Sequence, residues 1–231
     1  AISGRAVKYE GAIGTSIVKI FDLTAGSVGL TEEFLKHSGE KYLASITHPA
    51  SHAGYYPGAT PFSIKLLFTP EGRLLGAQVV GAQSVDNSLD VLAAMLKTGG
   101  SVDDLTTLEL AYAPPFSSAK SPINIAGYVA SNIIRNDMKA VSWDQVLDEK
   151  KPDILLLDVR EKREIEAGHI KDALHIPLND LRERLNELPK DKEIVVYCQV
   201  GLRAYIAARI LKQNGFRVSN LSGGWKTVKP I

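Results

Sequence analysis

The chain has 231 residues, with 27 lysines and arginines against 26 aspartates and glutamates, and one cysteine. A net charge of +1 offers no broad basic surface for nucleic acid, and a single cysteine excludes an internal disulfide. The sequence has no apolar run as long as the ~18–20 residues of a membrane span, and no signal-peptide pattern at its start. We therefore expect a cytoplasmic protein with one large or two small domains.

The first segment, residues 1–136, has grouped strands followed by helices. Runs rich in β-branched and aromatic residues predict strands at 15–22, 41–48, 62–69 and 74–82, and apolar spacing predicts helices at 86–97 and 123–134. The turn residues Pro70, Glu71 and Gly72 predict a hairpin between the last two strands. Because the strands do not alternate with helices, the segment is expected to be an α+β domain with an antiparallel sheet.

The second segment, residues 137–231, alternates strands and helices. The predicted strands lie at 154–159, 175–176, 193–197 and after 216, and the predicted helices begin after Ser142 and span 181–188 and 201–214. The run 154–159 is continuously apolar until an aspartate, as buried parallel strands are. The alternation predicts a parallel, doubly wound α/β sheet.

Cys198 follows the predicted strand 193–197 and precedes the predicted helix 201–214. In an open α/β sheet, ligands bind at the carboxyl ends of strands, where the next helix presents free N–H groups and its positive dipole end. Such surroundings favour a nucleophilic thiolate, and Arg203 adds a cation. We interpret Cys198 and Arg203 as catalytic; the alternative is a buried structural cysteine.

Several spaced motifs surround this loop. They are Asp158-Val159-Arg160-Glu161, Glu164, Gly168-His169-Ile170, Ala173, Ile176-Pro177, Cys198-x-x-Gly201-x-Arg203 and Leu221-Ser222-Gly223-Gly224-Trp225. Together they resemble a single-domain rhodanese over residues 138–231. The resemblance implies that Cys198 takes sulfur from a donor, holds it as a persulfide and passes it to an acceptor. The loop that would surround the outer sulfur consists of Gln199, Val200, Gly201 and Leu202.

Some features of the loop bear on its substrate. Its four residues between Cys198 and Arg203 form a tighter loop than that of cysteine phosphatases and arsenate reductase-like enzymes, which disfavours phosphoryl chemistry. Gln199 and Ala204 stand where thiosulfate-using rhodaneses often have a basic residue and Ser or Thr. The resemblance therefore favours a neutral or larger persulfide donor over thiosulfate.

Other polar residues of the second segment are assigned mainly structural roles. We expect His169 and His175 to orient loops and Asp158 to bond loop backbone beneath the site. Arg160 is a candidate substrate-facing residue. The two histidines have no partners at the spacing of metal ligands, and no metal site is expected.

Two loops of the first segment, 52–58 and 110–117, present aromatic rings between prolines and glycines. Packing in a core is the plain alternative to a role at an interface. With residues 14–17, 86–97 and 121–124, they resemble the C-terminal dimerisation domain of the coenzyme A-disulfide reductase and NADH oxidase group. The resemblance implies a homodimer through residues 5–135, in which Tyr55 and Tyr112 reach the reductase site of the partner.

The order of the two segments resembles flavoprotein reductases that carry a C-terminal rhodanese domain. For an intact enzyme, the resemblance implies FAD, NAD(P)H and coenzyme A, with persulfide, polysulfide or coenzyme A-linked sulfur substrates. The sequence has no Gly-x-Gly-x-x-Gly run, so this chain is expected to bind no flavin or nicotinamide cofactor and to be the C-terminal part of such an enzyme. A non-catalytic module that dimerises and docks a sulfur carrier is the alternative.

Overall fold

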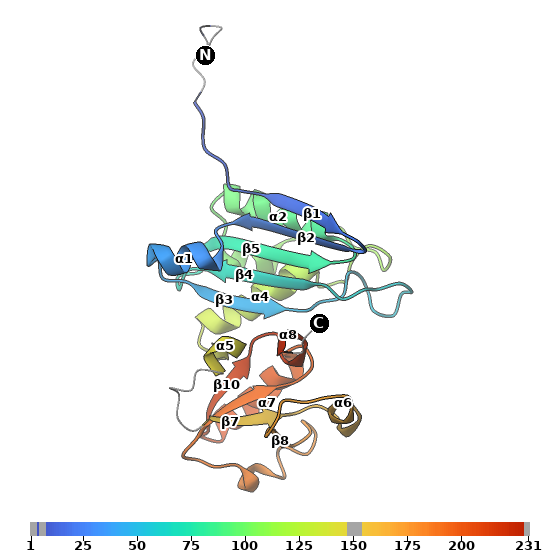
Figure 1. Cartoon of the computed structure of the whole chain (residues 1–231), viewed down its shortest axis with the longest axis vertical. Coiled ribbons are helices and arrows are strands. Elements are labelled where there is room, and N and C mark those ends of the chain that lie inside the picture. The colour runs from blue at the N-terminus through green and yellow to red at the C-terminus, as the bar shows by residue number, and fades with distance from the viewer. Residues whose placement is uncertain (1–3, 5–7, 147–153, 229–231) are drawn as a thin grey trace.

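The computed structural model describes residue 4 and residues 8–146 and 154–228. Residues 1–3, 5–7, 147–153 and 229–231 are not described, so the start of the predicted dimerisation segment and two parts of the predicted rhodanese segment lie outside the described residues. The remaining chain folds around two separate sheets, one above the other in Figure 1. The chain passes from the domain of the first sheet to that of the second between residues 134 and 140, close to the predicted domain boundary.

The first domain is a five-stranded antiparallel sheet in the order β1-β2-β5-β4-β3. Its strands are β1 (Ser16–Ile20), β2 (Leu23–Gly29), β3 (Leu43–Thr47), β4 (Ser63–Phe68) and β5 (Leu74–Gly81). Its helices are α1 (Glu32–Ser38), α2 (Val85–Lys97), α3 (Val102–Thr107) and α4 (Pro122–Ile134). The predicted antiparallel sheet and the hairpin of β4 with β5 are confirmed.

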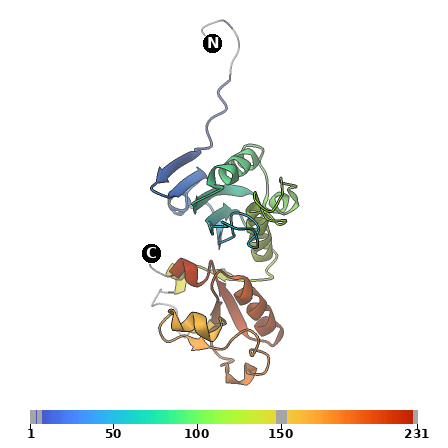
Figure 2. The same ribbon diagram turned by 90° about the vertical axis from the view of Figure 1, so that its right-hand side faces the viewer.

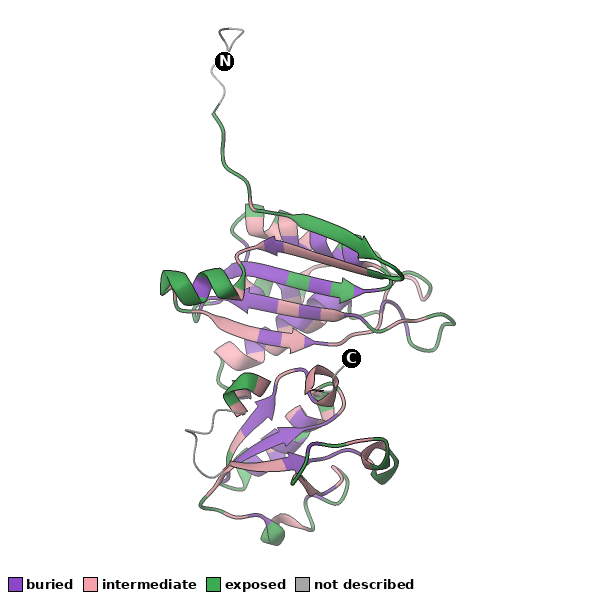
Figure 3. Cartoon of the chain, in the orientation of Figure 1, coloured by how far each residue is buried: buried purple, intermediate pink, exposed green. Residues whose placement is uncertain are grey.

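Alternation along β4 divides the core of this domain between two faces of the sheet. Ile64, Leu66 and Phe68 are buried in the main cluster with side chains of α2, α3 and α4. Leu67 instead packs with Leu35 of α1 in a smaller cluster. Figure 3 shows the contrast with β1, whose five residues are all exposed.

The second domain is a five-stranded sheet in the order β6-β10-β9-β7-β8, and all its paired strands are parallel. Its strands are β6 (Ala140–Val141), β7 (Ile154–Asp158), β8 (Leu174–His175), β9 (Glu193–Tyr197) and β10 (Arg217–Leu221). Its helices are α5 (Trp143–Val146), α6 (Lys162–Glu166), the 3₁₀ turn η1 (Leu185–Glu187), α7 (Leu202–Gln213) and α8 (Trp225–Val228). The predicted parallel sheet is confirmed.

The central strand β9 is buried on both faces. Ile194 and Val196 pack in one cluster with α7, whereas Val195 and Tyr197 pack in the cluster on the opposite face. Cys198 continues the first of these rows, so its side chain belongs to the face that α7 covers. This alternation fixes which side of the sheet the thiol occupies.

The structure differs from the sequence prediction most clearly at residues 181–188. A helix is wrong there, because the segment forms successive turns and the short η1. Leu181 and Leu188 are buried as the apolar spacing suggested, but turns bring them to the core. Arg184 pairs with Glu187 three residues later, which matches the tighter 3₁₀ spacing.

Strand β2 was not predicted from the sequence, because Leu23–Gly29 contains two glycines and few β-branched residues. Its glycine at position 26 is required by packing, since a Cβ there would collide with the Leu89 side chain of α2. The short elements α1, α3, β6, α6 and α8 were also missed.

The two domains contact each other directly, and Figure 2 shows them stacked along the long axis of the molecule. Ile46 N–H of β3 donates to Ser222 Oγ at 2.9 Å, and His48 Nε2 lies 2.9 Å from Thr227 Oγ1. His48 Nδ1 also lies 2.7 Å from Ser63 Oγ. A backbone N–H of β3 and the side chain of His48, just after β3, therefore bond to the C-terminal part of the second domain.

Candidate active site

The Cys198 loop connects β9 to α7. Cys198 is 1% exposed, and Gly201 N–H donates to its Sγ at 3.1 Å. Gly201 immediately precedes α7 and has φ of 112°, a left-handed conformation that glycine adopts readily. The strand thus delivers the thiol to the N-terminal end of a twelve-residue helix, where free N–H groups and the helix dipole favour an anion.

The segment after β10 forms two backbone hydrogen bonds with this loop. Trp225 N–H donates to Cys198 O at 2.8 Å, and Lys226 N–H donates to Gln199 O at 3.0 Å. Gly224 has φ of 61°, and a Cβ at this position would collide with Cys198 O. Gly224 is therefore explained by the close approach of two backbone segments.

Arg203 is fixed by a carboxylate that sequence reasoning did not assign to the site. Its guanidinium bonds Glu164 at both oxygens, at 2.6 and 2.7 Å, in the two-pronged geometry that arginine and carboxylate favour. The bond to Arg203 is the largest cause that lowers the pKa of Glu164, to about 2. The pKa of Arg203 is raised, first by Glu164 and further by Cys198. Arg203 therefore remains a cation beside the thiol.

Arg160 lies inside the domain and not at an open substrate-facing surface. Its side chain is 1% exposed, and its Nη2 bonds Asp158 Oδ2 at 2.7 Å and Gly168 O at 2.8 Å. The guanidinium also stacks 5.1 Å from the Trp225 ring. Arg160 is turned inward because it pairs with the Asp158 carboxylate, and a buried carboxylate needs a charged partner.

The network around Arg160 still reaches the cysteine loop. Arg160 Nη1 lies 3.4 Å from Gln199 Oε1, and His175 Nε2 lies 2.8 Å from Arg160 O. His169 Nδ1 lies 3.3 Å from Ile165 O. These contacts order the loops beneath Cys198, which is the kind of role that we expected for Asp158 and the two histidines.

Tyr55 and Tyr112 come together although 57 positions separate them. Their hydroxyls are 3.0 Å apart, and their side chains are 77% and 48% exposed. The hydrogen bond to Tyr55 is the main cause that raises the pKa of Tyr112. The two loops thus present a pair of phenols at the surface, although His52 and Ala53 of the first loop are buried.

The described residues contain no group of three or more His, Cys, Asp or Glu side chains that could hold a metal ion. Across the part of the chain that the structure describes, every helix is too short or too polar to cross a membrane.

Comparison with known families defines both domains. Residues 15–122 match the dimerisation domain of pyridine nucleotide-disulphide oxidoreductases, and residues 142–229 match the rhodanese-like domain. The chain therefore consists of a reductase dimerisation domain followed by a rhodanese-like domain.

The same pair of domains is present in solved structures of larger proteins. The chain resembles reduced Bacillus anthracis CoADR-RHD, with 46% identity and a TM-score of 0.92, over 95% of this chain and 40% of that one. It resembles a NAD-dependent persulfide reductase from A. fulgidus, with 40% identity and a TM-score of 0.86, over 96% of this chain and 40% of that one. Coenzyme A disulfide reductase of Staphylococcus epidermidis is 40% identical over 131 residues, which are 56% of this chain and 30% of that protein. The chain spans less than half the length of each of these relatives.

Proposed function

We propose that the rhodanese-like domain transfers sulfane sulfur through a persulfide on Cys198. The observation that carries this proposal is the 3.1 Å hydrogen bond from Gly201 N–H to Cys198 Sγ, at the start of α7 and beside Arg203. A thiolate needs such donors and positive charge, and a persulfide anion needs the same. The lining of the loop by Gln199, Val200 and Leu202 adds no second cation, which favours a neutral or larger persulfide donor over thiosulfate.

The transfer requires no external oxidant or reductant. The Cys198 thiolate attacks the outer sulfur of a donor R–S–SH, the donor S–S bond breaks, and the donor leaves as a thiolate. Cys198 then carries the outer sulfur as a persulfide. An acceptor thiolate attacks that outer sulfur, and the Cys198 thiolate leaves. Backbone N–H groups at the start of α7 would stabilise the anionic sulfur in both steps.

We further propose that the chain works within a coenzyme A-disulfide, persulfide or polysulfide reductase that is a homodimer through residues 5–135. The dimerisation family of the first domain and the names of the similar proteins support this proposal. Tyr55 and Tyr112 would donate hydrogen bonds at the reductase site of the partner. Their exposure and their mutual hydrogen bond suit phenols that act on a group outside their own domain.

The reductase proposal also implies FAD, NAD(P)H and coenzyme A. The described residues do not fit the two dinucleotides. The turn after β7 contains Arg160, whose side chain is turned inward to Asp158, and the turn after β9 contains Cys198. Neither turn has the glycine-rich run that brings a pyrophosphate against a helix. Flavin and nicotinamide chemistry would therefore need further domains.

Mass spectrometry after incubation with glutathione persulfide tests the sulfur-transfer proposal. We expect the mass of one additional sulfur atom on the peptide that contains Cys198, and its loss when a thiol acceptor is added. The Cys198→Ser variant is the matched control, because the sequence has no other cysteine. No adduct on the unsubstituted chain would contradict transfer and favour the alternative, a docking module for a sulfur carrier.

Sedimentation tests the dimer separately. The chain is expected to sediment as a dimer at micromolar concentration, and a monomer alone would contradict the proposed homodimer.

A further inference from the structure

The pair of Glu164 with Arg203 lies at the edge of the Cys198 loop. Arg203 is the only charged residue of the run 198–203, and its side chain is 31% exposed. Its two Nη atoms both donate to Glu164, whose side chain is 23% exposed. The same guanidinium interacts with Cys198, which is one of the smaller causes that raise the pKa of Arg203. One cation is therefore shared between a carboxylate and the reactive sulfur.

The Glu164 carboxylate removes most of the positive charge that the loop could offer to an anion. The bond to Arg203 is the largest cause that lowers the pKa of Glu164, to about 2, so the carboxylate is ionised at neutral pH. Glu161 N–H also donates to Glu164 Oε2 at 3.0 Å, which fixes the carboxylate at the start of α6. The pair of fixed, opposite charges has no net charge.

Two other cations close to the loop do not replace Arg203. Arg160 is buried, and its charge is paired with that of Asp158. Lys226 donates its backbone N–H to the loop, but its side chain lies toward the first domain. Burial first, and then the charge of Lys226, lower the pKa of His48 to about 4, which places that charge at the contact between the domains.

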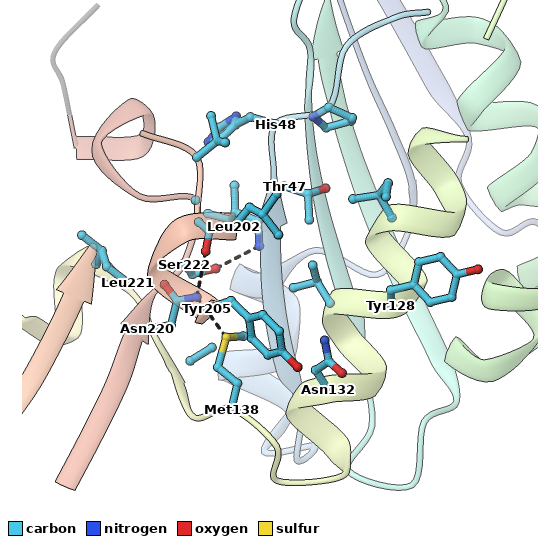
Figure 4. Close-up of a pocket in the computed structure, with 18 of the residues that line it drawn as sticks. Thr47, His48, Tyr128, Asn132, Met138, Leu202, Tyr205, Asn220, Leu221 and Ser222 are labelled. Carbon is cyan, nitrogen blue, oxygen red and sulfur yellow. Dashed lines mark hydrogen bonds between the residues drawn. The ribbon is translucent and has the colours of Figure 1, made fainter. Parts of the chain in front are cut away.

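Further cations belong to the first domain or to the exposed surface. The loop borders a cavity of about 580 Å³ between the domains, where it contributes uncharged residues such as Leu202 (Figure 4). Lys120 lines this cavity from the first domain, 3.1 Å from Tyr128 Oη. Lys162 and Arg163 of α6 are exposed, so water and salt screen their charges. Glu164 therefore decides how much positive charge an anion meets at the loop.

We propose that Glu164 is a specificity-determining residue that disfavours sulfur donors with an oxyanion group next to the reacting sulfur, such as thiosulfate. Donors whose charge is remote from that sulfur, such as alkyl persulfides, are favoured by comparison. An oxyanion beside the Cys198 thiolate needs a cation to balance it, and Arg203 is already paired. This inference rests on the proposed sulfur transfer at Cys198 and names the group that selects the donor by charge.

Alkylation of Cys198 by iodoacetate and by iodoacetamide tests the proposal. The two reagents are similar in size and differ by one negative charge next to the reacting carbon. The ratio of their rates therefore reports access for an anion, and a change in exposure or thiolate fraction alters both rates equally. Glu164→Gln keeps the size of the side chain and frees Arg203. We expect the ratio of the iodoacetate rate to the iodoacetamide rate to rise about fivefold or more.

Two variants serve as controls for this ratio. Glu166→Gln removes the same charge from an exposed position of α6 and should change the ratio by less than about twofold. Glu164→Asp keeps a carboxylate and should keep the ratio below that of Glu164→Gln. If Glu164 had only a structural role, Glu164→Gln would change both rates in parallel and leave the ratio as it was.

An unchanged ratio in a folded Glu164→Gln variant would overturn the proposal, as would an equal rise in Glu166→Gln. If Glu164→Gln does not fold, the unsubstituted chain decides. Raising sodium chloride from about 20 mM to about 500 mM should leave its ratio unchanged or increase it, because a neutral pair attracts no anion. A fall in the ratio would reveal an unpaired cation beside the thiol and refute the role of Glu164.

Alkylation does not require sulfur transfer, so the two proposals can fail separately. A rise of the ratio in Glu164→Gln, together with no persulfide after incubation with glutathione persulfide, would support selection by charge and contradict sulfur transfer. A persulfide on Cys198 with an unchanged ratio would do the reverse. Failure of both reagents to alkylate Cys198 would contradict both proposals, since the thiol would then be closed to small molecules.

Discussion

The cysteine loop of the rhodanese-like domain and the tyrosine pair of the dimerisation domain differ in how their reactive groups are held. Cys198 is buried and is surrounded by backbone donors, the pair of Arg203 with Glu164 and the segment after β10. Tyr55 and Tyr112 are exposed and bond chiefly to each other. The thiol and the charges around it lie within one domain, whereas the two tyrosine hydroxyls are open to solvent. Substitutions should therefore have very different effects at the two places.

The largest effect is expected from the buried charge beneath the cysteine loop. Arg160→Met would leave the Asp158 carboxylate buried and unpaired, at a cost of about 3–5 kcal/mol in the free energy of unfolding. Arg184→Met is the matched control, since Arg184 pairs with Glu187 at the surface and its loss should destabilise the protein far less. Urea unfolding measures both values. Equal losses would show that the loop is not held by its internal charges.

A second test applies to the contact between the two backbone segments at Cys198. Gly224→Ala adds a Cβ that collides with Cys198 O, in a left-handed conformation, and should cost about 2–3 kcal/mol. Gly215→Ala is the control, because Gly215 is also left-handed but a Cβ there meets nothing within 4 Å. We also expect the rate of Cys198 alkylation by iodoacetamide to change only in Gly224→Ala. An unchanged rate would mean that the segment does not position the loop.

The contact between the domains should depend on pH through His48. Its folded pKa of about 4 lies below the ordinary value of 6.5, first because of burial and then because of Lys226. The unfolded chain therefore takes up the proton first, and stability should fall by about 2–3 kcal/mol as the pH drops from 6.5 toward 4, with no change above pH 7.5.

Urea unfolding at several pH values measures this dependence on His48. His48→Gln, which cannot take up the proton, should flatten the curve between pH 6.5 and pH 4.5. An equal slope in the variant would assign the pH dependence to other groups.

The smallest effect is expected at the exposed tyrosines. Tyr55→Phe removes the hydrogen bond that raises the pKa of Tyr112, so this pKa should move down toward its ordinary value of 10. The free energy of unfolding should change by less than about 0.5 kcal/mol, because the pair is open to solvent. Ultraviolet titration and urea unfolding measure the two quantities. A large loss of stability would show that the tyrosines support their own domain.

Much of the fold could be predicted from local sequence patterns. The alternation in β4, the apolar run of β9 and the Ser121-Pro122 start of α4 are physical signals that lie within a few residues of one another. The predicted helix 181–188 failed because the spacing of its leucines also fits a series of turns. The strand β2 was missed because Gly26 reflects the approach of α2 and Gly29 the approach of β5, and both elements are distant in sequence.

The candidate site could be predicted only in part, because some of its contacts join residues that are distant in sequence. The position of Cys198 between a strand and a helix is local, and the sequence was enough to find it. The pairing of Arg203 with Glu164 spans 39 positions, and no spacing rule indicates it. Arg160 was a candidate substrate-facing residue, because the sequence alone does not show whether an arginine is exposed or buried. Only the structure shows that the guanidinium of Arg160 pairs with the Asp158 carboxylate inside the domain.

The hydrogen bond from Ile46 to Ser222 has a consequence for the first domain on its own. Strand β3 is at the end of its sheet, so one of its sides has no neighbouring strand within the sheet. Open strand edges pair with other chains and cause aggregation unless something covers them. In this protein, the second domain contributes to that cover by bonding a backbone N–H of β3. Besides its proposed chemistry, the rhodanese-like domain thus helps to keep the dimerisation domain from self-association along β3.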